Sequence, residues 1–166
     1  MLIGVLSDSH GRAAITVEAV RVLLDAGAER LLHLGDVGTD EVIEALAGVD
    51  ARIVLGNCDY PEAPLTRHAE RMGVAVDHPI GRFEVDGRTI AFTHGHLAEC
   101  MRDALAERVD YLLHGHTHLV RDERVGSTRI LNPGALFRAA RYTVGVLDPT
   151  TDQFQVIELP SSRTHP

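Results

Sequence analysis

Three histidines lie close together in the segment His114-Gly115-His116-Thr117-His118. Neutral imidazole is the commonest side-chain metal ligand, and alternate residues of an extended segment point the same way, so His116 and His118 could face one metal ion. A polar turn with surface histidines is the alternative, because short motifs also match by chance. The segment therefore indicates metal binding only if other parts of the chain supply further ligands.

Side chains that could bind a metal follow four other strand-like apolar runs. They are Asp8 and His10 after residues 2–7, Asp36 after residues 31–34, Asn57 after residues 51–55, and His94 after residues 88–93. Open α/β sheets bind ligands at the carboxyl ends of their strands. Each residue has an ordinary alternative, such as a helix cap for Asp36, a turn for Asn57 or a surface position for His94. Together they favour a single metal site.

The elements that must position these side chains alternate between strands and helices in the first half of the chain, and are mostly strands in the second. Strands are predicted at residues 2–7, 31–34, 51–55, 74–76, 82–85, 88–93, 109–113, 119–125, 128–131, 143–147 and 154–159, and helices at 12–26, 40–47, 65–72 and 97–108. Pro61 and Pro64 are expected to break any helix directly after the third strand. Asp86-Gly87 predicts a hairpin turn. This order indicates two facing mixed sheets with helices outside them.

Length and composition fit one domain over residues 1–166, with 45% hydrophobic residues and a formal net charge of −8. Cys58 and Cys100 form no CxxC pair, which argues against a disulfide framework and favours a reducing cytoplasm. No apolar run approaches the ~20 residues of a membrane-spanning helix. The acidic charge disfavours duplex nucleic acid as a partner, so a small anionic substrate would need a local positive charge such as a metal.

In their order along the chain, six polar motifs resemble those of the calcineurin-like metallophosphoesterases, and most closely the small single-domain phosphodiesterases of that superfamily. The motifs are Asp8-Ser9-His10-Gly11, Gly35-Asp36, Gly56-Asn57-Cys58-Asp59, Thr93-His94-Gly95-His96, Gly115-His116-Thr117-His118 and Asn132-Pro133-Gly134. The resemblance implies an α/β fold, a four-layer α/β/β/α sandwich of two mixed sheets flanked by helices.

The resemblance also implies a centre of two divalent metal ions. One ion would be held by Asp8, His10 and His118, the other by Asn57, His94 and His116, and Asp36 would bridge both. A carboxylate can do this because its two oxygens reach ions ~3.5–4 Å apart, the spacing of two-metal hydrolases. Nitrogen and oxygen ligands without thiolate suit Mn²⁺, Fe, Co²⁺, Ni²⁺ or Zn²⁺ better than Ca²⁺. Mn²⁺ is the metal expected from the family.

The implied activity is hydrolysis of small organic or nucleotide phosphodiesters by in-line attack of a metal-bridging hydroxide. The same centre could also accept a phosphomonoester, and a nuclease of the superfamily would need further elements to hold a polymer. A protein-binding scaffold like a retromer subunit, which has a similar fold but a degraded metal site, is the alternative from another class. Related small proteins form dimers or tetramers, so a homodimer or homotetramer is also expected.

The chain departs from many members of the superfamily at Cys58, where they carry a histidine that is thought to protonate the leaving group. A thiol is a poor acid near neutral pH, so we expect weak activity toward poor leaving groups. Cys58 is interpreted as structural, or as a substrate contact, rather than as a catalytic thiol. His96 is the candidate replacement, either as the acid or as a phosphate contact, with a surface or structural histidine as the alternative.

Two further residues are candidates for supporting roles. Arg12 follows the first motif at a predicted helix start, a position suited to binding an anion of the substrate, although exposed arginines there more commonly pair with carboxylates. Asp59 is better placed to orient a ligand than to be one. His114 is expected not to bind metal.

Overall fold

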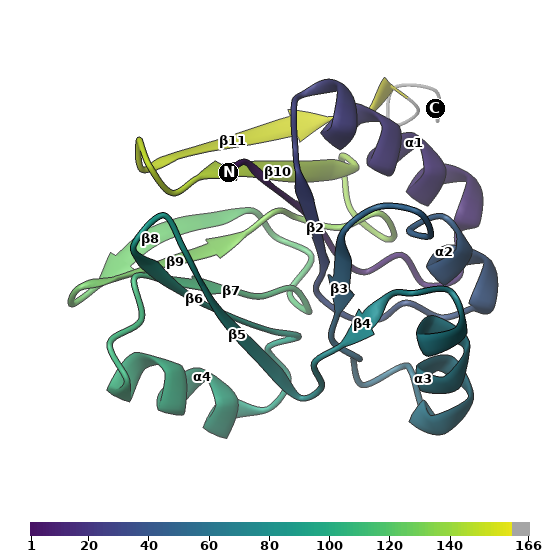
Figure 1. The fold of residues 1–166 in the computed structure, drawn as a ribbon, viewed down its shortest axis with the longest axis horizontal. Coiled ribbons are helices and arrows are strands. Elements are labelled where there is room, and N and C mark those ends of the chain that lie inside the picture. Colours follow the sequence, from purple (N-terminus) through teal and green to yellow (C-terminus); the bar gives the residue numbers. More distant parts are fainter. Residues whose placement is uncertain (161–166) are drawn as a thin grey trace.

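The structure, a computed structural model, describes residues 1–160 as eleven strands and four helices (Figure 1). The strands are β1 (Ile3–Leu6), β2 (Arg30–His33), β3 (Ala51–Ile53), β4 (Ala75–Val76), β5 (Ile80–Val85), β6 (Arg88–Thr93), β7 (Tyr111–Leu113), β8 (Arg121–Val125), β9 (Thr128–Asn132), β10 (Thr143–Asp148) and β11 (Gln153–Glu158). The helices are α1 (Ala13–Asp25), α2 (Asp40–Glu44), α3 (Glu62–Arg71) and α4 (Ala98–Ala106).

The strands form two mixed sheets. The first has the order β11-β10-β1-β2-β3-β4, and the second has the order β5-β6-β7-β9-β8. In the first sheet β1 to β4 are parallel, whereas β10 and β11 are antiparallel additions to one edge. In the second sheet the central strands β6, β7 and β9 are parallel, with an antiparallel strand on each side.

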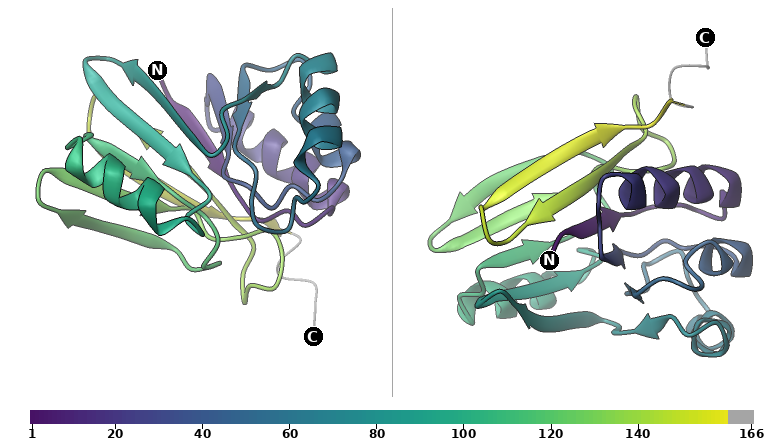
Figure 2. Two further views of the ribbon diagram at one scale, coloured as in Figure 1. Left: turned by 90° about the horizontal axis from the view of Figure 1, so that it is seen from below. Right: turned by 45° about the horizontal axis from the view of Figure 1, so that its top comes forward.

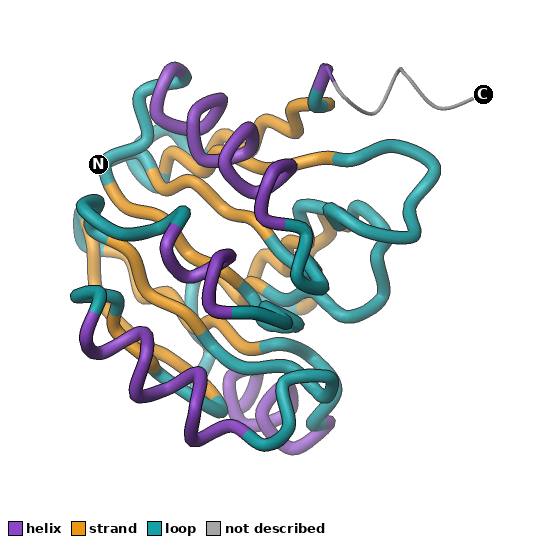
Figure 3. The backbone as a smooth tube through the Cα atoms, turned by 90° about the vertical axis from the view of Figure 1, so that its right-hand side faces the viewer, coloured by secondary structure: helices purple, strands orange, loops and turns teal. Residues whose placement is uncertain are grey.

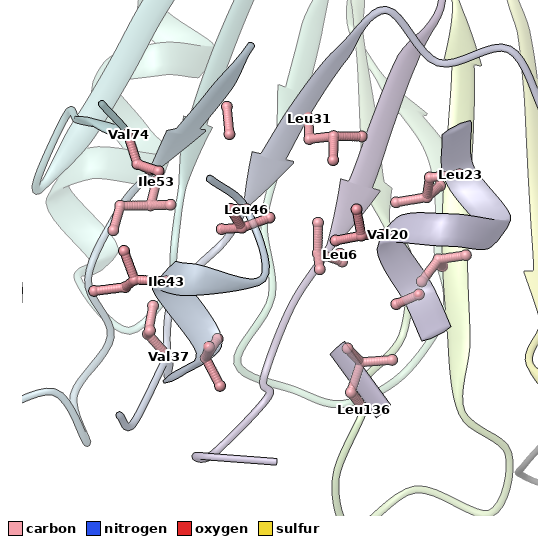
Figure 4. Packing of buried hydrophobic residues seen from close by; sticks show 14 of the residues in the cluster. Leu6, Val20, Leu23, Leu31, Val37, Ile43, Leu46, Ile53, Val74 and Leu136 are labelled. Atoms are coloured by element: carbon pink, nitrogen blue, oxygen red, sulfur yellow. The ribbon is translucent and has the colours of Figure 1, made fainter. Parts of the chain in front are cut away.

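Three buried hydrophobic clusters separate four layers. The largest lies between the first sheet and helices α1 to α3, and includes Leu6, Leu23 and Ile53 (Figure 4). A second joins the two sheets through residues such as Phe92, and a third packs α4 against the second sheet. Figure 2 shows the sheets face to face, with α4 on one outer side and the other helices on the opposite side. The predicted four-layer α/β/β/α sandwich is confirmed.

The loops that follow the parallel strands are joined to one another by backbone hydrogen bonds. In the first sheet, the amides of Asp8 and His10 donate to the carbonyls of Gly35 and Asp36. In the second sheet, the amide of Gly115 donates to the carbonyl of His94. Figure 3 shows the loops of the chain in teal at the ends of the orange strands. The fold therefore gathers the predicted polar motifs at one end of both sheets.

The expectation that Pro61 and Pro64 break any helix after the third strand is wrong. Helix α3 begins at Glu62, directly after Pro61, and Pro64 lies in its first turn. The first amides of a helix have no acceptor within it, so a proline there removes no hydrogen bond. Among residues 1–160, no helix is both long and apolar enough to cross a bilayer.

Candidate metal centre

The first group of predicted ligands gathers around the carboxylate of Asp8. His118 places its Nε2 atom 3.1 Å from Asp8 Oδ1, and His10 places its Nε2 atom 4.0 Å from the same oxygen. The two imidazole rings have centroids 5.5 Å apart. One ligand atom of each of the three residues lies within 4.8 Å of the other two, close enough for all three to contact one ion.

The second group gathers around the carboxylate of Asp36. His10 Nε2 and His94 Nε2 each lie 3.4 Å from Asp36 Oδ2, so this carboxylate stands between the two groups. Asn57 Oδ1 lies 3.1 Å from His94 Nε2, and the ring of His116 has its centroid 5.1 Å from that of His94. The structure thus brings together the seven predicted ligands, Asp8, His10, Asp36, Asn57, His94, His116 and His118.

The backbone at these positions is left-handed rather than extended. Positive φ angles occur at Asp8 (57°), His10 (45°), Asp36 (52°), His116 (67°) and His118 (59°). The expectation that His116 and His118 point the same way from an extended segment is therefore wrong, although both side chains reach the centre. A left-handed residue with a Cβ costs roughly 1–2 kcal/mol, and such strain clusters at functional sites.

Two glycines allow the backbone to pass close to the carboxylates. A Cβ atom at Gly56 would lie 2.1 Å from Asp36 Oδ1, and one at Gly115 would lie 1.9 Å from Ser7 Oγ. Both distances are far shorter than a van der Waals contact, so any larger residue would displace the side chains around the centre. The glycines before Asn57 and His116 are therefore needed for close packing of the loops.

Buried polar atoms without partners support a metal in this place. Within residues 1–160, Asp8 Oδ1 and His10 Nε2 are buried and have no hydrogen-bond partner. Such atoms cost about 1–3 kcal/mol each when left unpaired. Asp8 Oδ2, in contrast, accepts hydrogen bonds from the Ser7 hydroxyl at 2.5 Å and the His116 amide at 3.1 Å. Burial raises the pKa of Asp8, and a bound cation would favour its ionised form.

The hydrogen bonds of the second group leave a ring nitrogen and a carboxylate facing each other. His94 Nδ1 lies 2.7 Å from the carbonyl oxygen of Leu34 and donates to it, which leaves Nε2 facing Asp36. Burial opposes a charge on His94, but Asp36 outweighs it and raises the pKa of this histidine. Burial also opposes ionisation of Asp36, yet His94 and the amide of Cys58 hold its pKa far below the usual range. An ionised carboxylate, an imidazole and an amide oxygen at one point fit a divalent cation.

Asp59 connects the two loops that carry Asp36 and Asn57. Its carboxylate accepts hydrogen bonds from the amides of Val37 at 3.0 Å, Gly38 at 2.8 Å and Gly56 at 2.8 Å. The residue is buried. This is the location expected of a residue that orients ligands, because it determines the shape of both loops without pointing into the centre.

His96 lies next to the second group of ligands. Its ring centroid is 5.3 Å from that of His94 and 6.2 Å from that of His116, and its Nδ1 atom is buried without a hydrogen-bond partner in the described part of the chain. Burial lowers the pKa of His96, and the two neighbouring imidazoles lower it further. The neutral ring that results can donate a hydrogen bond to a phosphate oxygen, whereas a lowered pKa disfavours the protonated form that a general acid needs.

Cys58 and Arg12 have different surroundings. The thiol of Cys58 lies within 4.8 Å of ligand atoms of His10 and Asp36, but burial and Asp36 raise its pKa, which disfavours a reactive thiolate. Arg12 donates to the hydroxyl of Tyr142 at 2.7 Å and lies over the ring of that residue. The guanidinium is therefore directed toward residues 133–142, and the structure does not bring it among the ligands.

His114 lies behind the centre and does not join the ligand groups. Its Nδ1 atom contacts the carbonyl of Gly115 at 3.0 Å, and Arg121 contacts its Nε2 atom at 3.2 Å. Burial lowers the pKa of His114, which keeps the ring neutral. Both nitrogens thus have partners within the protein.

Sequence analysis missed three residues around the centre. Ser7 donates to Asp8, and its position beside that residue was an available signal. His33 is buried, contacts the hydroxyl of Ser9 at 2.8 Å, and has its pKa lowered by burial to about 3. Phe137 packs against His10 with ring centroids 4.9 Å apart, and nothing in the sequence indicated that contact.

Comparison with known proteins identifies the family to which the chain belongs. The profile of the calcineurin-like phosphoesterase superfamily domain matches residues 1–152. The chain belongs to this superfamily. Phosphodiesterase MJ0936 of Methanocaldococcus jannaschii is 27% identical to this phosphoesterase over 167 residues, which cover 96% of the chain and 99% of that protein. Phosphodiesterase YfcE of Escherichia coli (strain K12) is 27% identical over 145 residues, covering 78% of the chain and 76% of YfcE.

A solved structure of an archaeal phosphodiesterase matches this phosphoesterase with a TM-score of 0.85 and 26% identity. The match covers 96% of the chain and all of the other protein, 100%. The predicted family is therefore confirmed, together with its closeness to small phosphodiesterases. The His and Asp clusters are consistent with a metallophosphoesterase.

Proposed function

We propose that the protein is a metal-dependent phosphodiesterase that hydrolyses small organic or nucleotide phosphodiesters. The observation that carries this proposal is the convergence of carboxylate, imidazole and amide groups around Asp36, including buried atoms that lack protein partners. The names of the similar proteins MJ0936 and YfcE, both phosphodiesterases, support the same activity.

Two divalent ions, Mn²⁺ as the family resemblance implies, would share the centre. Asp8, His10 and His118 would hold one, Asn57, His94 and His116 the other, and Asp36 would contact both. In the loaded centre, the chemistry supplied is Lewis acidity toward the phosphoryl oxygens and activation of water as a nucleophile. The protein positions the metal ligands, because the left-handed loops and the contacts of Asp59 hold them in place before substrate binds.

His96 is proposed as the group that contacts the phosphate or protonates the leaving oxygen. Support comes from its location beside His94 and His116 and from its unpaired Nδ1 atom. The His96→Ala change should slow hydrolysis of alkyl esters more than that of nitrophenyl esters, because a good leaving group needs no proton. Equal losses for both would exclude the acid role.

Three other functions would use the same fold. A phosphomonoesterase would use the same ligands, and a nuclease would need a basic groove that a chain of net charge −8 does not favour. A scaffold would bind other proteins and would hydrolyse no substrate. The complete ligand set argues against the scaffold, because a protein-binding surface has no need of strained residues around an acidic centre.

One experiment tests these possibilities together. Metal content is measured on the purified protein, and hydrolysis of bis(p-nitrophenyl) phosphate is compared with that of p-nitrophenyl phosphate in the presence of Mn²⁺, Ni²⁺, Co²⁺ or Zn²⁺. A phosphodiesterase hydrolyses the diester at the higher kcat/KM. A preference for the monoester would make the protein a phosphomonoesterase, and a metal-loaded protein inactive on both would favour the scaffold.

A further inference from the structure

An apolar groove lies beside the candidate metal centre, with His118 on its wall. Its volume is about 430 Å³, and it is formed by the residues after β7, by residues 139–143 and by β11. Hollows of about 300–1,000 Å³ are typical of small-molecule sites. The groove therefore has the size of a ligand site and shares one wall residue, His118, with the predicted metal centre.

Three large apolar side chains line this groove and are exposed to solvent. The exposed fraction is 69% for Leu119, 51% for Val120 and 36% for Val156. Exposed apolar residues that occur singly need no explanation, but a contiguous set marks a binding surface. Here the set comes from two distant parts of the chain, which the fold brings together next to His118.

The polar groups of the groove are already engaged with one another or with the backbone. Arg141 and Glu158 form an ion pair at 3.3 Å, so their charges balance. The hydroxyl of Thr143 donates to the carbonyl of Pro133 at 2.7 Å. The groove thus offers apolar contact beside an exposed ion pair whose charges balance.

We propose that this groove binds one ester arm of the phosphodiester, and that the arm is an apolar aryl or alkyl group. The inference rests on the proposed phosphodiesterase function, because a phosphate held at the centre would direct one substituent past His118 and over Val120. Leu119 and Val156 provide further apolar contact for that substituent. A phosphodiester has a second substituent to place there, which a small phosphomonoester lacks.

The test uses two unreactive anions and a matched pair of variants. Diphenylphosphinate and dimethylphosphinate carry the same charge, and their P–C bonds are not hydrolysed. Binding of each to the Mn²⁺-loaded protein is measured by calorimetry for the wild type, for Val120→Ser and for Val125→Ser. Val125 is the control, since it is 45% exposed and lies at the far end of β8 from Val120.

The wild type should bind diphenylphosphinate more tightly than dimethylphosphinate. Val120→Ser should reduce that preference roughly three- to tenfold, as expected for losing apolar contact, while Val125→Ser keeps the wild-type ratio. Leu119→Ser is a second variant with the same expectation. KM for bis(p-nitrophenyl) phosphate should rise in parallel in both groove variants, and KM for p-nitrophenyl phosphate should change less.

An unchanged preference in both groove variants would overturn the proposal. So would a change of oligomeric state without a change in phosphinate binding, because the groove would then be an interface between copies of the chain. Wild-type protein that binds the phosphinates with the expected preference but hydrolyses no phosphodiester would refute the proposed activity and leave the groove as an aryl-binding site. The two proposals can therefore fail separately.

Discussion

Two clusters of charged side chains lie at opposite ends of the second sheet and are built differently. The candidate metal centre lies at the carboxyl ends of β6 and β7. The amino-end cluster, defined as Tyr111, Asp122, Arg124, Arg129 and Asp152, lies where β7 and β9 begin. Asp8 and Asp36 are buried, whereas Asp122 is exposed and Asp152 half-buried, and only the second cluster contains arginine.

In the amino-end cluster each carboxylate has a cation. Arg129 lies 2.7 Å from Asp122 and 2.9 Å from Asp152, and Arg124 also pairs with Asp152. Hydrogen bonds from Arg129 lower the pKa of Asp122. Burial opposes ionisation of Asp152, but the hydrogen bonds that Asp152 accepts from Tyr111 and Arg129 lower its pKa as well. This cluster satisfies itself, as a structural ion-pair network does.

In the metal centre the acceptors have no such cation. Within residues 1–160, Asp8 Oδ1 and His10 Nε2 have no hydrogen-bond partner, and Arg12 is directed toward Tyr142. The comparison indicates that a cluster of acidic side chains is a ligand site when its acceptors outnumber its cations and the surplus is buried.

The largest difference is expected for two equivalent changes, Asp36→Asn and Asp152→Asn. Asp36→Asn removes the proposed bridging charge, so the transition state should lose several kcal/mol of stabilisation. The kcat/KM for a phosphodiester should therefore fall about 10³-fold. It should also reduce the bound metal per chain. Asp152→Asn should leave both quantities unchanged, because its partners are arginine and tyrosine. Metal analysis and diester turnover measure the two effects.

Asp59→Asn should weaken the centre without removing a ligand. The amide side chain has one acceptor oxygen instead of two, so it cannot accept all the hydrogen bonds from Val37, Gly38 and Gly56. Loss of such supporting contacts typically costs 10- to 100-fold, so we expect a fall of about that size in metal affinity. Titration with Mn²⁺ measures it.

The control for Asp59 is Asp77→Asn, which breaks a bidentate pair with Arg52 away from the centre. That change should lower the melting temperature and leave the Mn²⁺ affinity alone. If both variants weaken metal binding equally, Asp59 acts through general stability and not through the loops that it connects.

His33, which is buried near the metal centre, should make the free energy of unfolding sensitive to mild acid. Its pKa in the folded protein is about 3, because burial disfavours the charged ring, compared with 6.5 when exposed. As the pH falls below 6.5 the unfolded chain takes up this proton and the folded chain does not, so the free energy of unfolding decreases, by about 1.4 kcal/mol per pH unit at most. The loss continues until the pH reaches the folded pKa.

His33→Gln should therefore flatten the dependence of stability on pH between about 6.5 and 4, and denaturant unfolding in the presence of a chelator measures it. Some slope will remain, because burial also lowers the pKa of His114. Stability curves for the wild type and the variant that run parallel through this range would show that His33 is not the group responsible.

Much of the fold and the ligand set could be predicted because each signal is local. Apolar runs predicted the strands, and a polar motif at each strand end predicted a donor for the centre. The boundary of α3 was missed since Pro64 is harmless in a first turn and harmful only later in a helix. Motif order predicted the family, which the match over residues 1–152 confirms.

What could not be predicted depends on contacts between distant segments. Local preference disfavours a left-handed aspartate or histidine, yet Asp36 and His116 adopt that backbone because neighbouring loops hold it. The direction of Arg12 depends on Tyr142, which reaches it only after the chain has crossed both sheets. The groove beside His118 likewise needs Val120 and Val156 to meet.

The smallest effect is expected from Arg129→Met in the amino-end cluster. The change removes a charge that pairs with Asp122 and Asp152, but both carboxylates are partly exposed and Arg124 still pairs with one of them. We expect the free energy of unfolding to fall by about 1 kcal/mol, as for ion pairs that water can partly replace. Calorimetry should show a melting temperature lower by about 2–4 °C, with metal content and turnover unchanged. A loss of bound metal in this variant would mean that the two ends of the sheet are coupled, because the self-satisfied cluster would then be contributing to the shape of the centre.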